Sequence, residues 1–301
     1  MFSLSTSWCS ANIQTGFELL QKVEETGFEA IELDYRITES IFEEIHGILK
    51  RKEILVTSIH NYFPHPDDIP REQASGDLFS LSSLDTEEQE KAVKYTCRTI
   101  QVANDLEVPA IVLHLGKVDM DPEKEKISKA VNSDEEARKI LDKKLKERKS
   151  KAPKHLDALF HSLEKVNKEA ERQNVLLGIE TRYNYHEIPD FEEIGLILKK
   201  FDGSQLKYWH DTGHAQVNEN LGIAIHEDFL KEYKDYLIGL HIHDAREMDD
   251  HRAPGFGNIN FNMVAQYWDN TIRVFEVHPK VSLEQLIKGR SLLIERDLKV
   301  D

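Results

Sequence analysis

The sequence predicts a (β/α)8 barrel formed as a single domain over residues 1–301. Three observations favour this fold. Short apolar runs alternate with longer stretches of helical spacing, which is typical of parallel strands joined by helices. The runs are rich in Ile, Val and Leu, as expected for strands covered on both faces. Each run also ends in polar residues, and the active site of such a barrel lies where its strands end.

The alternation places each element in chain order. The apolar runs predict strands over Phe2–Trp8, Ala30–Tyr35, Leu55–Asn61, Ala110–Gly116, Val175–Thr181, Leu206–Asp211, Leu237–Asp244 and Ile272–His278. Helical spacing predicts helices over Thr15–Thr26, Glu39–Lys52, Asp85–Glu107, His155–Gln173, Phe191–Phe201, Glu227–Tyr236, Phe261–Trp268 and Ser282–Lys299. Eight strands alternating with eight helices are the number that closes one barrel.

Two connections are longer than a minimal barrel needs. Tyr62–Leu84, after the third strand, contains several Pro, Ser and Asp residues and is predicted to form a long loop over the rim. Lys117–Pro153, after the fourth strand, is predicted to hold an inserted charged helix. Long loops on the catalytic face usually form lids or substrate walls.

Composition is that of a soluble protein, with 40% hydrophobic residues. Met1–Ser10 lacks the basic flank and the apolar stretch of a signal peptide, and no apolar run is long enough to cross a bilayer. We therefore expect a cytoplasmic protein with no membrane partner. Cys9 and Cys97 lie far apart and in no CxxC pair, so both are expected to be buried thiols.

The charge balance argues against nucleic acid as a partner. The formal net charge is −16, from 39 Lys and Arg against 55 Asp and Glu. Such a surface repels phosphate backbones unless a local basic patch intervenes. The one basic stretch, Arg138–Lys154, is interleaved with acidic residues and is interpreted as a solvated helical face.

Nine potential ligands for divalent metals lie at or just past the predicted strand ends. They are His60, His114, Glu180, Asp211, His214, His241, Asp249, His251 and Glu276. Their imidazoles and carboxylates suit Zn²⁺, and carboxylates also suit Mn²⁺ and Mg²⁺. The C-terminal ends of barrel strands meet at one rim, so the sequence predicts a metal site there.

The sharpest local signal is Asp211-Thr212-Gly213-His214. Asp211 ends a strand, and Gly213 is expected to allow a turn that brings His214 back toward the same centre. The alternative is a tight turn with an exposed histidine.

A second signal is His241-Ile242-His243, because alternate residues of a strand share a face. Asp249 and His251 are expected to come from a loop that folds back over the rim, with sharp bends at Gly255 and Gly257.

Two glutamates and two further histidines complete the pattern. Glu180 and Glu276 each close an apolar run, where a carboxylate is costly unless it is paired or bound to a metal. His60 and His114 are weaker signals, because a lone histidine at a strand end is more often a hydrogen-bonded structural residue.

These residues resemble a known family. The order of the nine ligands, with the DTGH and HxHD…DxH…PGFG units, is similar to the xylose-isomerase-like TIM-barrel superfamily over nearly the whole chain. That superfamily includes sugar and sugar-phosphate isomerases and epimerases and the endonuclease IV type of apurinic endonuclease. The resemblance implies that the nine positions match those holding three zinc ions in endonuclease IV. In the epimerases, the positions matching Glu180, Asp211, His241 and Glu276 hold one metal ion.

The resemblance implies two principal functions. In an isomerase or epimerase, Glu180 and Glu276 would move a proton on and off carbon beside a bound Zn²⁺, Mn²⁺ or Mg²⁺. Arg182, His214 and His243 would then hold hydroxyls or a phosphate of a small polyhydroxylated or phosphorylated substrate. In a phosphoesterase, two or three zinc ions would activate water. The number of ions, one to three, and self-association into a homo-oligomer stay open.

Two further points bear on this choice. The arginine that ketose 3-epimerases carry six residues past the histidine of the seventh strand falls here on Glu247, which argues against close kinship with them. A relative with other chemistry, such as a dehydratase of cyclic polyols, or with no catalysis, stays a third alternative, since fold does not determine function.

Overall fold

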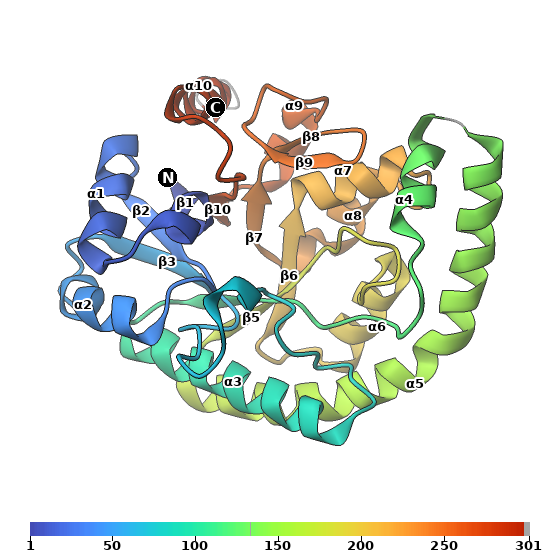
Figure 1. Ribbon diagram of the computed structural model, residues 1–301, viewed down its shortest axis with the longest axis horizontal. Coiled ribbons are helices and arrows are strands. Elements are labelled where there is room, and N and C mark those ends of the chain that lie inside the picture. The colour runs from blue at the N-terminus through green and yellow to red at the C-terminus, as the bar shows by residue number, and fades with distance from the viewer. Residues whose placement is uncertain (133, 298–301) are drawn as a thin grey trace.

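A computed structural model describes residues 1–132 and 134–297 (Figure 1). Eight strands pair in parallel and close in the order β1-β10-β7-β6-β5-β4-β3-β2. They are β1 (Phe2–Ser5), β2 (Ala30–Leu33), β3 (Leu55–His60), β4 (Ala110–Leu113), β5 (Leu176–Glu180), β6 (Leu206–Asp211), β7 (Leu237–Ile242) and β10 (Ile272–Phe275). The closed order confirms the predicted (β/α)8 barrel.

Helices surround this barrel (Figure 1). The main ones are α1 (Gly16–Thr26), α2 (Glu39–Lys50), α3 (Thr86–Asp105), α5 (Glu135–Gln173), α6 (Phe191–Lys200), α8 (His226–Tyr233), α9 (Phe261–Val264) and α10 (Leu283–Asp297). Local sequence sets where they begin. Thr15 and Asp190 form capping boxes with Glu18 and Glu193, which satisfy free backbone N–H groups of α1 and α6. The predicted end of the last helix, at Lys299, lies outside the described residues.

The connection after β4 differs from the prediction. A short helix, α4 (Lys124–Ile127), precedes α5, and α5 runs unbroken from Glu135 past Pro153. The predicted inserted helix and the helix predicted to begin at His155 are therefore one helix. Its early start has a local cause, because the Asp134 side chain accepts the N–H groups of Glu136 and Ala137 and caps the helix.

The basic stretch within α5 is only partly solvated, contrary to the interpretation from the sequence. Arg148 is buried and forms ion pairs with Asp190 at 2.7 Å and with Glu193 at 2.6 Å. Its guanidinium thereby links α5 to the start of α6. A buried charge needs such partners, so this arginine supports the contact between helices and does not form a surface patch.

The barrel interior is apolar below its C-terminal rim. Trp209 is fully buried there, in one cluster with Val112 and Val274. Gly178 and Gly239 make room for its ring, since a Cβ atom at either position would lie 2.9 Å or less from the indole. Inward-facing residues alternate along each strand, so the next inward position above this floor falls at the rim.

Two elements at the rim were not predicted. Helix α7 (Thr212–Asn220) follows β6 directly, and a hairpin of β8 (Asp244–Arg246) and β9 (Asp249–Arg252) follows β7. Both cysteines are free: Cys9 is buried as expected, whereas Cys97 is only half-buried. None of the helices within residues 1–132 and 134–297 combines the length and the hydrophobicity needed to cross a bilayer.

Candidate metal centre

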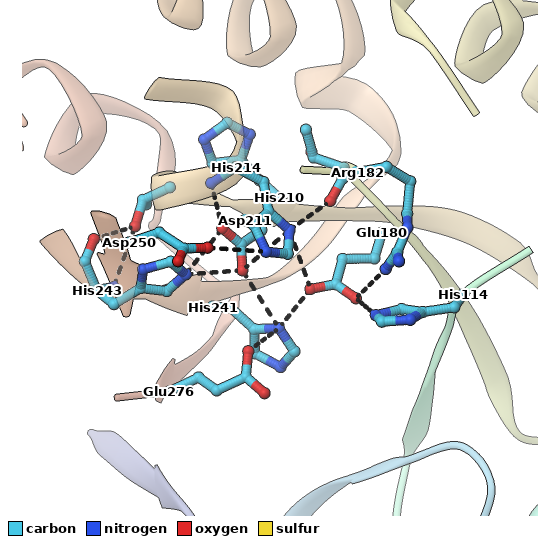
Figure 2. A network of polar contacts seen from close by, with 12 residues as sticks. His114, Glu180, Arg182, His210, Asp211, His214, His241, His243, Asp250 and Glu276 are labelled. Atoms are coloured by element: carbon cyan, nitrogen blue, oxygen red, sulfur yellow. Dashed lines mark hydrogen bonds and ion pairs between the residues drawn. The ribbon is translucent and has the colours of Figure 1, made fainter. Parts of the chain in front are cut away.

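Four strand ends direct potential ligands to one point above the apolar floor. They are Glu180 from β5, Asp211 from β6, His241 from β7 and Glu276, just past β10, and one ligand atom from each lies within 4.8 Å of the others (Figure 2). His241 Nδ1 is 2.8 Å from Glu180 Oε1, 3.1 Å from Glu276 Oε2 and 3.8 Å from Asp211 Oδ2. We call these four residues the deep group.

A second set shares Glu180 with the deep group. His114 Nε2 lies 2.7 Å and His60 Nε2 3.6 Å from Glu180 Oε2, and the three residues form a further cluster of potential ligands. The glutamate can therefore offer one oxygen to each side. Glu180 is therefore common to two sets of potential ligands.

A third set lies nearer the surface, and we call it the rim group. It consists of His214 on α7 with Asp250 and His251 on β9. Asp250 Oδ2 is 2.9 Å from His251 Nδ1 and 3.6 Å from His214 Nε2. His251 Nε2 is 3.6 Å from Glu276, which connects the rim group to the deep group.

Asp249 does not lie in this cluster, which corrects the expectation from the sequence. Its carboxylate pairs with Arg252 and with Lys280, the latter at 3.0 Å, and its side chain is 46% exposed. The φ of 52° at His251 lies in the left-handed region and interrupts the alternation of side chains along β9, so Asp250 and His251 lie on the same side and Asp249 points away. Asp250 takes the place expected for Asp249.

His243 was expected to bind substrate, but both of its ring nitrogens are occupied. Nδ1 accepts the backbone N–H of His251 at 2.8 Å, so the proton of the neutral ring lies on Nε2, 2.9 Å from Asp211 Oδ1. The ring is fully buried and does not line the cavity described below. We therefore assign His243 to holding Asp211 in place.

Gly213 also acts differently from the expectation. It lies inside α7, where a Cβ atom would be 2.1 Å from the His243 ring, so it provides space for that ring and no turn. His214 reaches the centre because Asp211 caps α7 and accepts the His214 backbone N–H at 2.7 Å. One carboxylate thus ends a strand, begins a helix and faces the site.

One buried carboxylate, that of Asp244, fixes the loop after β9 at the rim. Asp244 accepts the backbone N–H groups of Ala245, Gly255, Gly257 and Ile259 at 2.8–3.0 Å. Gly255 has a φ of 89°, as expected for a sharp bend. Gly257 is needed for close approach, because a Cβ atom there would be 2.2 Å from Asp244.

Each charged group at the centre alters the pKa of its neighbours. Burial alone would raise the pKa of Glu180, but His114 and His241 hold that pKa well below its usual range. Burial opposes protonation of His241, yet Glu276 and Glu32 raise its pKa well above the ordinary value. Asp77 and Glu180 likewise raise the pKa of His114 to about 9, against its burial and the charge of Arg182. Protons on these histidines supply the positive charge that the carboxylates need.

A cavity of about 240 Å³ opens onto the centre. Its lining comprises Tyr35, His60, His114, Glu180, Arg182, Tyr183, Asn184, Glu187, His214, Asp250, His251 and Glu276. Arg182 is buried and donates to Asp77 at 3.0 Å, while its Nε and Nη1 groups have no hydrogen-bond partner. Unsatisfied buried donors that line a cavity favour an oxygen-rich ligand in it.

Sequence reasoning missed Asp77, Asp250 and Glu32. Asp77 sits on the loop after β3, which approaches the centre closely: a Cβ atom at Gly76 would be 2.7 Å from the rings of His60 and His114. Nothing in the spacing of that loop marks the contact. Glu32 carried a signal, since it interrupts an apolar strand in the run Ala30–Leu33.

The residues present fit a divalent metal. The deep group offers three carboxylates and one imidazole, all buried, which is a suitable donor set for Zn²⁺ or Mn²⁺. Glu180 Oε2 is buried with His114 Nε2 at 2.7 Å, so two atoms that could bind a cation lie side by side. So many buried carboxylates in one place are costly without positive charge among them.

Fold and site together define a parallel-barrel protein with a cluster of potential metal ligands at the C-terminal rim. The family model of the xylose isomerase-like TIM barrel matches residues 20–267, and the chain belongs to that family. This confirms the resemblance seen in the sequence. The match covers the deep group except Glu276, and all of the rim group.

Solved structures share the fold at low sequence identity. A D-tagatose 3-epimerase-like protein is 19% identical with a TM-score of 0.69, covering 99% of this chain and 97% of its own. An L-ribulose 3-epimerase is 16% identical with a TM-score of 0.70, covering 100% and 94%. A 3-keto-D-glucoside 4-epimerase from E. coli is 13% identical with a TM-score of 0.69, covering 98% of each chain. No curated protein matches the sequence.

Proposed function

We propose that this protein is a divalent-metal-dependent isomerase or epimerase of a small sugar or sugar phosphate. One observation carries the proposal: Glu180 and Glu276 approach the same point from β5 and from the end of β10, within a cavity large enough for a small substrate. Similarity in fold to three sugar epimerases supports it.

The two glutamates are suited to moving a proton at carbon. Glu180 and Glu276 are ionised, because neighbouring histidines hold the pKa of each well below its usual range, so either one can accept a proton. One would take the proton from the carbon next to the substrate carbonyl and later release it to solvent. The other, after taking a proton from solvent, would deliver that proton on the opposite face or at the neighbouring carbon. A bound Zn²⁺, Mn²⁺ or Mg²⁺ would supply positive charge that stabilises the enediolate.

Other residues would orient the substrate. Arg182 lines the cavity, and its Nε and Nη1 groups have no hydrogen-bond partner. Its Nη2 lies 3.0 Å from Asp77 and 3.5 Å from Glu187, and these ion pairs hold the guanidinium in place. A guanidinium held in this way binds hydroxyl, carbonyl or phosphate oxygens. His214 also lines the cavity and is a second candidate for contacting the substrate. The β3–α3 loop closes this side of the site and would limit access of water.

A multinuclear zinc phosphoesterase is the second candidate function. Three neighbouring sets of potential ligands favour it, because clustered metals can clamp the attacking and leaving oxygens of a phosphate ester. The net charge of −16 disfavours a nucleic acid substrate, whose binding depends on many phosphate contacts. A small phosphate ester would be the better candidate for this activity.

One experiment separates the two functions. Protein reconstituted with Mn²⁺ or Zn²⁺ is incubated in D2O with a panel of ketoses, aldoses and their phosphates, and deuterium uptake at carbon is followed by NMR. We expect uptake next to the carbonyl and formation of an isomer or epimer with at least one substrate. Cleavage of phosphate esters or of abasic DNA, with no uptake across the panel, would place the phosphoesterase first.

A further inference from the structure

A buried carboxylate on the opposite side of the barrel faces the one imidazole of the deep group. Glu32 lies on β2, is fully buried and accepts a hydrogen bond from Ser58 Oγ at 2.8 Å. Its two oxygens lie 3.1 and 3.2 Å from Nε2 of His241. Apart from His241 and Ser58, no hydrogen bond to this carboxylate is found among the described residues.

The position of Glu32 determines which nitrogen of His241 carries a proton. The Nδ1 atom faces Glu180 and Glu276, at 2.8 and 3.1 Å, and is therefore the atom directed to the proposed metal. A neutral imidazole has one N–H and one lone pair. With the N–H held on Nε2 by Glu32, a bound metal would displace the proton from Nδ1 and take the lone pair of that atom.

We propose that Glu32 is a positioning residue that fixes the orientation and the Nε2–H tautomer of His241 and makes its Nδ1 a stronger metal ligand. The inference rests on the proposed metal centre. A carboxylate that accepts the second N–H of a ligating histidine raises the basicity of the ligand, and removing such a carboxylate typically weakens metal binding by about 10- to 100-fold.

A purely structural role explains Glu32 less well. Burying a carboxylate is costly, and an apolar side chain would fill the same space at lower cost. Inward-facing residues of the barrel floor, such as Val112 and Val274, are apolar for that reason. The charge of Glu32 is placed where it acts on His241.

The test uses Co²⁺ alone as the probe, with the full-length protein. The affinity is measured by competition with a chelator, and the visible absorption spectrum reports the ligand field. We expect Glu32→Gln, which keeps the size of the side chain and removes its charge, to bind Co²⁺ about 10- to 100-fold more weakly and with an altered spectrum. Glu193→Gln is the matched control, because Glu193 is also buried but pairs with Arg148 outside the barrel. It should change stability and leave the Co²⁺ affinity and spectrum unchanged.

The outcomes distinguish this inference from the proposed function. If the wild-type protein binds no Co²⁺, both are wrong. If the wild type binds Co²⁺ and a folded Glu32→Gln variant binds it equally well with the same spectrum, only the role of Glu32 is wrong. Should Glu32→Gln fail to fold, Ser58→Ala replaces it: loss of the hydroxyl that holds Glu32 should weaken Co²⁺ binding by about fivefold. Unchanged affinity in Ser58→Ala would then overturn the inference.

Discussion

The deep group and the rim group present similar residue types in different ways. Three members of the deep group, Glu180, Asp211 and His241, belong to strands, and Glu276 directly follows one. In the rim group, His214 belongs to a short helix, and Asp250 and His251 belong to a two-stranded hairpin outside the barrel. Deep side chains are buried, whereas those of Asp250 and His251 are 22% and 27% exposed.

The difference shows what fixes a ligand in this fold. Parallel pairing sets the register between neighbouring strands, such as Asp211 opposite His241, and the barrel interior leaves one direction for an inward side chain. The two strands of the rim hairpin pair only with each other and belong to no larger sheet. A shift of one residue there moves a carboxylate away from the site, as Asp249 shows.

The largest expected effect comes from the ligand shared between sets. Glu180→Gln should lower deuterium uptake at the substrate carbon by about 10²- to 10⁴-fold, because it removes a base and an ionised ligand together. Metal analysis of the same sample should show loss of bound ion. His251→Gln is the comparison from the rim group and should keep most of the uptake. Equal losses in the two variants would remove the distinction between deep and rim groups.

The pH dependence of stability tests whether His226, which packs behind β6, is neutral in the folded state. His226 lies behind β6 and contacts His210 through their Nε2 atoms at 3.0 Å. Burial lowers the pKa of His226 to about 4, whereas an unfolded chain would have the ordinary pKa of about 6.5. The unfolded state therefore binds more protons between these values, and stability must fall as pH falls through this window.

The expected loss attributable to His226 is about 3 kcal/mol between pH 6.5 and pH 4, since each pKa unit corresponds to about 1.4 kcal/mol. Urea unfolding of metal-free protein at several pH values measures it. His226→Gln cannot titrate and should show a shallower dependence on pH than the wild type. Identical slopes in both proteins would mean that this histidine is not held neutral in the folded state.

The same contrast explains what could be predicted from the sequence. All eight strands and the four residues of the deep group follow from apolar runs and the residues that end them, because strand burial and strand direction leave a clear pattern. The long helix α5 was divided in two, since Pro153 and the charged stretch before it concealed continuous helical structure. Asp77 was missed because its contacts with the centre arise from the folding of the loop after β3, and the partner of Glu32 lies on a strand distant in sequence.

The hairpin offers the finest test of the comparison, because adjacent aspartates face opposite ways. Asp250→Asn should weaken binding of the last metal ion by at least about tenfold, or 1.4 kcal/mol, because Asp250 faces both His214 and His251. Asp249→Asn is the matched control and should leave that affinity unchanged, since Asp249 pairs with Arg252 and Lys280 at the surface. Isothermal titration with Zn²⁺ compares the two variants with the wild type. Weaker binding in Asp249→Asn and unchanged binding in Asp250→Asn would contradict this assignment. That result would show that the hairpin shifts by one residue when metal binds.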